Sequence, residues 1–278
     1  MGVMSAGEAE AFKVFEAEGW SARAGTYGGL IGAITGRLAE SLLDTAGVRS
    51  DWRVLDVATG PGYVAGRAAA RGARVVGVDL AEGMLELARQ RVGGVELLRA
   101  DAEQLPFDDA SFDAVLGGFV INHLPHPQRA LAEAARVLVS GGQVAFSVWD
   151  RPERMRVIGV VKEAIETAGV DRDALPAGGP DPYRCADEGE FRALLQGAGI
   201  VGVTVRTVEL THRIAGTEEL VRGLLGSSVR TAALLRAQSA VARRRTMAAL
   251  KRTVEPYRTS DGALELPVSA KLASGGKR

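Results

Sequence analysis

The sequence predicts an α/β fold in which seven mostly parallel strands form a doubly wound, Rossmann-like sheet with helical lid segments. Two observations predict this fold. From Arg53 onward, short runs of apolar and β-branched residues alternate regularly with helical stretches, as in repeated strand–helix–strand units. The strand runs are almost wholly apolar, as expected where helices cover both faces of a sheet. Helix ends are marked by Gly72 and by the pair Gly141 and Gly142.

Five strands and three helices make up the first part of the predicted sheet. The run VLDVA at 54–58 is the first expected strand, and the helical stretch YVAGRAAARG follows it. The second strand, VVGVD, leads into the helical stretch GMLELARQR. The remaining elements are expected as strands at 95–100, 112–118 and 143–149, with a helix at 127–138 before the last strand.

Two more strands are predicted near the end of the chain, at 203–214 and 264–273. Pro267 indicates an edge position or a bulge there, because proline has no N–H to donate to a neighbouring strand. Apolar residues at helical spacing predict two helices within 8–46, one helix at about 153–168 and helical structure across 217–255.

The helices that the sheet does not need suggest a division of the chain. We expect 49–150 to be the ligand-binding core, because open α/β sheets bind ligands beyond the carboxyl ends of their strands. Residues 1–48 would form part of a lid over that edge, and 151–185 an insertion or cap with a Gly/Pro-rich stretch. Residues 186–278 would complete the sheet and carry the helical insertion at 217–255. In the alternative interpretation these helices only pack against the sheet.

Composition excludes several classes of protein. The 278 residues are 46% hydrophobic and 24% charged, which are globular values. Lys plus Arg and Asp plus Glu both number 34, so the chain lacks the basic excess of a dedicated nucleic-acid binder. The single Cys185 cannot form an internal disulfide, the first residues do not resemble a leader, and apolar runs are too short to span a bilayer. We therefore expect a cytoplasmic protein with no membrane or nucleic-acid partner.

The segment VLDVATGPGYVAG at 54–66 joins the first strand to a turn of small residues. Its GPGYVA part fits the dinucleotide pattern G-x-G-x-x-A, and Asp79 follows at the distance of a ribose-binding acid, so an NAD(P)-dependent oxidoreductase is one interpretation. Asp56 argues against it, because a carboxylate beside the helix that follows would repel a pyrophosphate. A nucleoside cofactor with a cationic end fits better, and S-adenosylmethionine is such a molecule.

Four segments in unbroken order, from about Arg53 to Trp149, carry a resemblance to a known family. They are VLDVATGPGYVA, VVGVDLAEGMLELA, LLRADAEQLPFDDASFDAVLGGFVINHL and RVLVSGGQVAFSVW. Together they resemble the successive motifs of class I S-adenosylmethionine-dependent methyltransferases, and most closely the branch with quinone-ring methylating and bacterial natural-product enzymes.

The resemblance implies a role for individual residues. Asp56 would hold the methionyl ammonium, Asp79 would accept both ribose hydroxyls, and Asp101 would accept from the adenine amino group. Ala58 stands where the family often has its first glycine. The implied cofactor contacts are Trp20, Tyr27, Asp56, Ala58, Thr59, Gly60, Gly62, Asp79, Leu80, Met84, Asp101, Ala102, Gly117 and Gly118. In the alternative interpretation the acids are helix caps, and Gly117 and Gly118 serve only close sheet packing.

One side chain near the end of the fourth strand suits proton transfer. His123, in the run NHLPH, could take a proton from a phenol or enol, because imidazole titrates near neutral pH. It could equally cap or pack against the next helix. No Cys or Glu cluster with ligand spacing surrounds the three histidines, so no metal site is expected.

These observations predict an enzyme that transfers a methyl group from S-adenosylmethionine to O, C or N of a small organic molecule, in bacterial secondary metabolism or quinone-type biosynthesis. Two alternatives remain open, an NAD(P)-dependent oxidoreductase and a non-methylating cyclase that uses the bound cofactor. The expected partner is a small-molecule methyl acceptor, and a homo-oligomer is compatible with the sequence.

Overall fold

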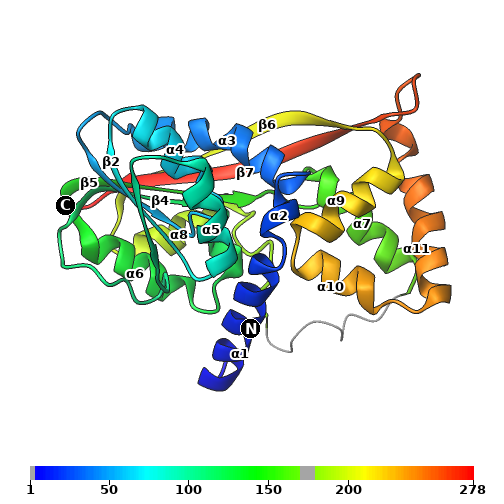
Figure 1. The fold of residues 1–278 in the computed structure, drawn as a ribbon, viewed down its shortest axis with the longest axis horizontal. Helices are drawn as coiled ribbons and strands as arrows, with labels where there is room; N and C mark the ends of the chain where they lie inside the picture. Colours follow the sequence, from blue (N-terminus) through cyan, green and yellow to red (C-terminus); the bar gives the residue numbers. More distant parts are fainter. Residues whose placement is uncertain (1–3, 170–178) are drawn as a thin grey trace.

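The computed structural model describes residues 4–169 and 179–278 and confirms the predicted fold class (Figure 1). One seven-stranded sheet has the strand order β3-β2-β1-β4-β5-β7-β6. Its strands are β1 (Arg53–Val57), β2 (Arg74–Asp79), β3 (Val95–Arg99), β4 (Phe112–Gly118), β5 (Leu138–Trp149), β6 (Val201–Ile214) and β7 (Leu264–Gly276).

The helices surround this sheet and extend beyond one end of it. They are α1 (Ala6–Ser21), α2 (Ala24–Tyr27), α3 (Ile31–Ala46), α4 (Tyr63–Ala70), α5 (Glu82–Arg91), α6 (Pro127–Val137), α7 (Arg156–Thr167), α8 (Glu188–Gly197), α9 (Thr217–Ser227), α10 (Arg230–Ala237) and α11 (Ala240–Thr253), with short 3-10 helices η1 (Ile121–His123) and η2 (Glu255–Tyr257).

Strand direction brings the ends of the first strands to one edge. Strands β1 to β5 pair in parallel, and β7 pairs antiparallel with both β5 and β6. It follows that β6 runs with β1 to β5 and that β7 alone runs the other way. In β1 and β2, Asp56 pairs with Gly77 and Val57 with Val78, so the acid near the end of β1 and Asp79 lie at the same edge.

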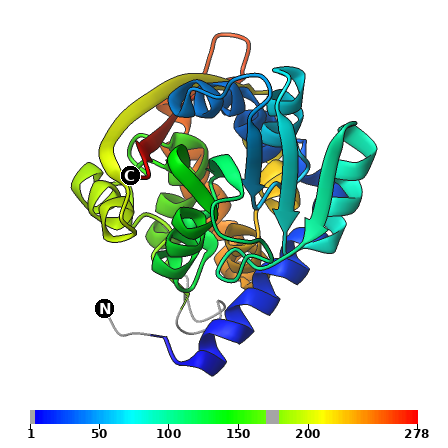
Figure 2. The ribbon, with the colours of Figure 1, turned by 90° about the vertical axis from the view of Figure 1, so that its left-hand side faces the viewer.

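Two apolar clusters, one on each face of the sheet, form the core. On one face, α3, α4 and α7 pack with the inward residues of the sheet, Ile34 and Leu43 being fully buried. On the other face, α6 and α8 pack over Val115, Phe146 and their neighbours. Helix α1 projects from the body of the molecule, and α9, α10 and α11 gather at one end (Figures 1 and 2). No helix in the described ranges is both long and apolar enough to cross a membrane.

Several elements differ from the sequence-based expectation. Three helices rather than two precede β1. Strand β5 begins at Leu138, where the helix was expected to end, and its Gly141 takes a φ of +80°. Helix α8 was not expected, although Asp187 caps it and the buried Phe191 and Leu195 have helical spacing.

Pro267 has the edge-like surroundings that its chemistry requires. It pairs with Thr211 of β6, but the pairing of β7 with β5 starts only at Ala270. The N-terminal half of β7 therefore has β6 as its only sheet neighbour among the described residues. Of the Gly/Pro-rich stretch PAGGPDP at 176–182, the first three residues lie outside the described residues.

Candidate functional site

The main cavity lies at the carboxyl edge of the sheet, under α1 and α2. It encloses about 960 Å³ of space, counted with its opening to solvent. Its walls include most of the residues that the sequence singled out, namely Trp20, Tyr27, Ala58, Gly60, Asp79, Leu80, Met84, Asp101, Ala102, Gly118 and His123.

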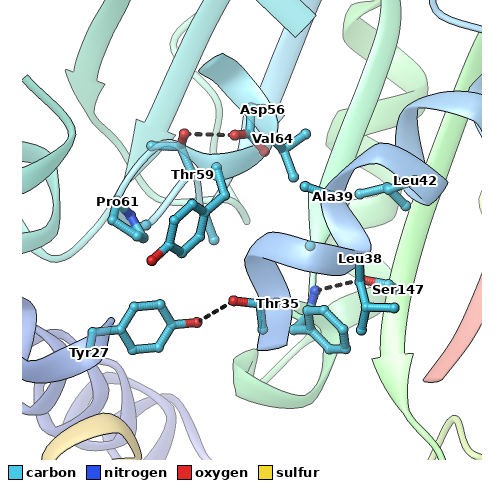
Figure 3. Close-up of a pocket in the computed structure, with 15 residues that line it drawn as sticks. Tyr27, Thr35, Leu38, Ala39, Leu42, Asp56, Thr59, Pro61, Val64 and Ser147 are labelled. Atoms are coloured by element: carbon cyan, nitrogen blue, oxygen red, sulfur yellow. Dashed lines mark hydrogen bonds between the residues drawn. The ribbon is translucent and has the colours of Figure 1, made fainter. Parts of the chain in front are cut away.

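A smaller cavity of about 430 Å³ adjoins the main one behind the glycine turn, and Figure 3 shows the residues that line it. Asp56 and Thr59 line this smaller cavity rather than the main one. Tyr27 and the turn residues Ala58 and Gly60 line both cavities, so the two cavities adjoin each other. Gly62 and Gly117, two predicted contacts, line neither cavity.

Hydrogen bonds inside the turn fix the position of Asp56. Its Oδ2 accepts from the Thr59 hydroxyl at 2.7 Å (Figure 3). The same oxygen accepts from the Ala65 N–H at 3.0 Å. Burial raises the pKa of Asp56 to about 7, despite these bonds. We expected a full negative charge at the mouth of the turn, but Asp56 is a buried group that organises the turn from behind. The electrostatic argument against a diphosphate ligand therefore loses much of its force.

The backbone of the turn takes the left-handed conformation at three positions. Ala58 has a φ of +54°, Gly60 of +54° and Gly62 of +80°. A non-glycine residue is uncommon in this region, so Ala58 is strained where the family often has glycine. At Gly62 a Cβ atom would lie 3.0 Å from Val92, so this glycine serves the packing of α4 on the segment after α5.

Asp79 sits at the end of β2 with its carboxylate held in place by two backbone groups. Oδ2 accepts from the Gly60 N–H and Oδ1 from the Ala81 N–H, both at 2.8 Å. Burial raises the pKa of Asp79, while those two bonds oppose the rise. Asp79 thus joins the turn to the start of α5 and presents its carboxylate to the main cavity.

Asp101 is ion-paired with a residue that the sequence did not single out. Lys13 of α1 places its Nζ 2.6 Å from Oδ2 of Asp101 and 2.8 Å from Glu103. Burial lowers the pKa of Lys13, but the two carboxylates raise it by more, so the net shift is upward. Lys13 therefore stays charged and holds α1 over this end of the cavity.

The two glycines that end β4 have different surroundings. A Cβ atom on Gly117 would lie 2.4 Å from the ring of Phe146, which supports the close-packing interpretation of this residue. Gly118 faces both cavities, and a Cβ there would meet only ordinary contact, with Val64 at 3.6 Å.

Aromatic rings form much of the remaining wall. Trp20 meets His123 edge to face, with ring centroids 5.3 Å apart, and Tyr27 in the same manner at 5.7 Å. Phe119 stacks on Trp149 at 3.9 Å and holds a φ of +59°, a strained angle for a bulky residue. The Tyr27 hydroxyl lies 3.2 Å from Thr35 Oγ1, and burial raises its pKa to about 12. The cavity suits a planar, apolar group.

His123 lies beside a carboxylate that the sequence analysis missed. Nδ1 of His123 is 2.9 Å from Oε2 of Glu16 in α1. Ala9, Phe12 and Glu16 form the buried stripe of α1. An acid on the apolar side of a predicted helix is a signal that could have identified Glu16, since a buried carboxylate needs partners. Within the described ranges, no group of three or more His, Cys, Asp or Glu side chains has metal-binding geometry.

Comparison with known proteins bears on this same stretch of chain. Residues 55–146 match a family model described as a methyltransferase domain. A demethylmenaquinone methyltransferase of Clavibacter sepedonicus is 45% identical over 103 residues, which cover 36% of this chain and 42% of that protein. The matches span 42 to 56% of the length of the first curated relatives, so the chain spans about half of each.

Solved structures resemble the whole sheet. A protein of Bacillus halodurans aligns with a TM-score of 0.57 and 23% identity, over 86% of this chain and 98% of that one. A phosphoethanolamine N-methyltransferase of Haemonchus contortus, solved with S-adenosylhomocysteine, aligns with a TM-score of 0.53 and 19% identity, over 87% of this chain and 53% of that one. At these identities the likeness shows the fold.

Proposed function

We propose, because residues 55–146 are a class I S-adenosylmethionine-dependent methyltransferase domain, that this protein transfers a methyl group to a small organic molecule. The predicted family resemblance is confirmed by that match and by the menaquinone and ubiquinone methyltransferases among the relatives. The activity, the acceptor and the pathway of the whole protein are our proposal.

The residues around the two cavities fit S-adenosylmethionine. When bound, this cofactor supplies a sulfonium methyl group with an excellent leaving group. Ala58 and Gly60 leave room for a ligand against the backbone of the turn, and Asp79 presents a carboxylate suited to ribose hydroxyls. Leu80, Met84 and Ala102 offer the apolar surface that an adenine ring needs. The smaller cavity, with Asp56 behind the turn, would take the methionyl end.

The acceptor would lie on the aromatic side of the main cavity. Trp20, Phe119 and Trp149 supply flat apolar surfaces, and His123 is the proton acceptor in reach of them. A planar ring with an acidic hydroxyl, as in a reduced quinone, matches these surroundings. The demethylmenaquinone methyltransferases among the relatives support a quinone-type or secondary-metabolite acceptor. Cytoplasmic location and a homo-oligomeric state stay predictions.

One observation carries the proposal: the matched segment supplies the turn, Asp79, Asp101, Ala102 and Gly118, and all of these lie around two adjoining cavities. Catalysis would consist mainly of holding acceptor, methyl carbon and sulfur in line while water is excluded.

Titration calorimetry with S-adenosylmethionine, S-adenosylhomocysteine and NAD⁺ tests the proposal. We expect binding of the first two by the wild type and by Asp108→Asn, an exposed control. Asp79→Asn should lose affinity at least tenfold, because the ribose hydroxyls lose a charged acceptor. Acceptors incubated with enzyme and cofactor should gain one CH₂ unit in mass. Tight NAD⁺ binding without S-adenosylmethionine binding would refute the proposal.

A further inference from the structure

We propose that Glu16 is the residue that positions His123 for proton transfer, by holding the imidazole in the form with its proton on Nδ1 and its lone pair on Nε2. This inference rests on the proposed methyl transfer and adds a role for a lid residue. It is carried by the contacts of Glu16, His123 and Arg230.

Glu16 is buried and its carboxylate is bonded on both oxygens. The residue is only 5% exposed. Its Oε2 accepts from Trp20 Nε1 at 2.8 Å and faces His123 Nδ1 at 2.9 Å. Its Oε1 accepts from Arg230 Nε at 2.9 Å. A buried acid with one partner on its own helix and two partners from distant parts of the chain has little freedom to turn away from the imidazole.

The carboxylate keeps its charge. Burial alone would raise the pKa of Glu16, but the neighbouring His123 and Arg230 outweigh it, and the net shift is downward. An ionised carboxylate can only accept hydrogen bonds, so the proton between Glu16 and His123 must belong to Nδ1. In the neutral imidazole the lone pair then lies on Nε2.

The Nε2 side of the ring has no hydrogen-bond partner among the described residues, and His123 belongs to the wall of the main cavity. His123 lies on η1, lines the main cavity and keeps 29% of its side chain exposed. Within the described part of the chain, Glu16 is the only hydrogen-bond partner of the imidazole ring. Trp20, which shares the same carboxylate, packs its ring edge-to-face with the imidazole and limits its rotation.

Arg230 anchors the pair from the other side. Its guanidinium donates to the carbonyl oxygens of Pro180 at 2.7 Å and Asn122 at 2.8 Å, and it lies over the ring of Phe12. The fixed positive charge stabilises the ionised form of Glu16, so the carboxylate is a poor destination for the proton. The proton taken from the acceptor therefore stays on the imidazole.

The proposed step balances without a further reactant. The acceptor hydroxyl gives its proton to Nε2 of His123 while its oxygen forms the new bond to the methyl carbon. The electron pair of the broken carbon–sulfur bond remains on sulfur, which becomes a neutral thioether. Glu16 stabilises the imidazolium until Nε2 releases the proton to solvent.

NMR of ¹⁵N-histidine-labelled protein tests the tautomer directly, because the chain has three histidines that single substitutions can assign. In the wild type and in Glu18→Gln, an exposed control on the same helix, neutral His123 should carry its proton on Nδ1. In Glu16→Gln the side-chain amide can donate to Nδ1, and the proton should shift to Nε2. A wild-type imidazole protonated on Nε2 would overturn the inference even if methylation is observed.

Kinetics with naphthols of graded acidity give the second readout. Glu16→Gln should lower kcat by roughly 10- to 100-fold for weakly acidic naphthols, as is usual for residues that orient a reacting group. The effect should shrink for nitro-substituted naphthols, which ionise without a base. The dissociation constant for S-adenosylmethionine should change less than about twofold. A loss of kcat that is equal for all naphthols would refute the positioning role, whereas a wild type that neither binds S-adenosylmethionine nor methylates would refute the proposed function.

Discussion

At the scale of one residue, Ala58 keeps the backbone conformation of the turn although the family often has glycine at this position. The turn needs a left-handed backbone at this position, and Ala58 provides it with a φ of +54°. A Cβ atom in this region costs roughly 1–2 kcal/mol, which glycine avoids. The turn holds because its other bonds, such as Thr59 N–H to the Val78 carbonyl, compensate for that cost.

Ala58→Gly should therefore raise the free energy of unfolding by about 1 kcal/mol, after the entropy that glycine adds to the unfolded chain is subtracted. Urea unfolding measures this. The matched control is Ala248→Gly in the exposed face of α11, where the same change should cost about 1 kcal/mol. Equal losses in both variants would show that Ala58 is not strained.

Asp56 makes stability depend on pH in a definite direction. Its pKa in the folded protein is about 7 and the ordinary carboxyl value is 3.8, so between these values the folded protein holds a proton that the unfolded chain has released. The contribution of Asp56 is present at low pH, falls as pH rises toward 7 and is constant above that.

Asp56→Asn should remove this contribution. Relative to this variant, the wild type should lose on the order of a few kcal/mol of unfolding free energy between about pH 4 and about pH 8, at ~1.4 kcal/mol per pKa unit. Urea unfolding of both proteins across this range gives the difference, and Asp108→Asn is the exposed control. A constant difference would mean that Asp56 titrates alike in the folded and unfolded states.

Individual residues also mark the limit of prediction from sequence. The turn, Asp79 and the residues proposed to lie against adenine follow one another along the chain, so their motif order predicted that they lie at one edge of the sheet. Glu16 and Lys13 carry no such local pattern. His123 lies 107 residues from Glu16 along the chain, and Asp101 lies 88 residues from Lys13. Only the docking of α1 brings each pair together.

At the scale of an element, β4 uses two adjacent glycines for two purposes. Gly117 faces the core side, where the Phe146 ring occupies the space of a side chain, and Gly118 faces the cavity. Alternation of faces along a strand makes this division necessary. The sequence could place both glycines at the end of a strand, but it could not show which face each one serves.

Gly117→Ala should lower the free energy of unfolding by about 1–3 kcal/mol, because its Cβ atom would overlap the Phe146 ring. Phe146→Leu should offset part of that loss in the double variant, which a double-mutant cycle measures. Gly118→Ala is the matched control and should lose little stability but weaken S-adenosylmethionine binding. Equal destabilisation by both alanines would contradict the assignment.

At the scale of the whole molecule, the order of the first five strands and their helices could be predicted because each strand is an almost continuous apolar run. The position of β7 between β5 and β6 could not, since no local signal distinguishes it from an edge strand. The path of α1 was equally hidden, because its buried apolar stripe is short and its ion pairs join it to residues far along the chain, Asp101 and Arg230.

The docking of α1 on the body should depend on Lys13. Lys13→Met leaves Glu103, whose side chain is 3% exposed, without its cation, at a cost of roughly 1–3 kcal/mol. Hydrogen–deuterium exchange of the α1 amides should then become about tenfold faster or more. Glu10→Gln, exposed on the same helix, is the control. Unchanged exchange in Lys13→Met would show that apolar contacts alone hold the helix.

Ile214 at the end of β6 pairs with Leu264 at the start of β7, so the segment 215–263 leaves the sheet and re-enters it at the same place. Helices α9, α10 and α11 therefore form one insertion between β6 and β7, and Arg230 within this insertion donates to Glu16 of α1. Changes in the length or sequence of this insertion would therefore alter the surroundings of Glu16 and His123 while the register of β1 to β5 stays as it is.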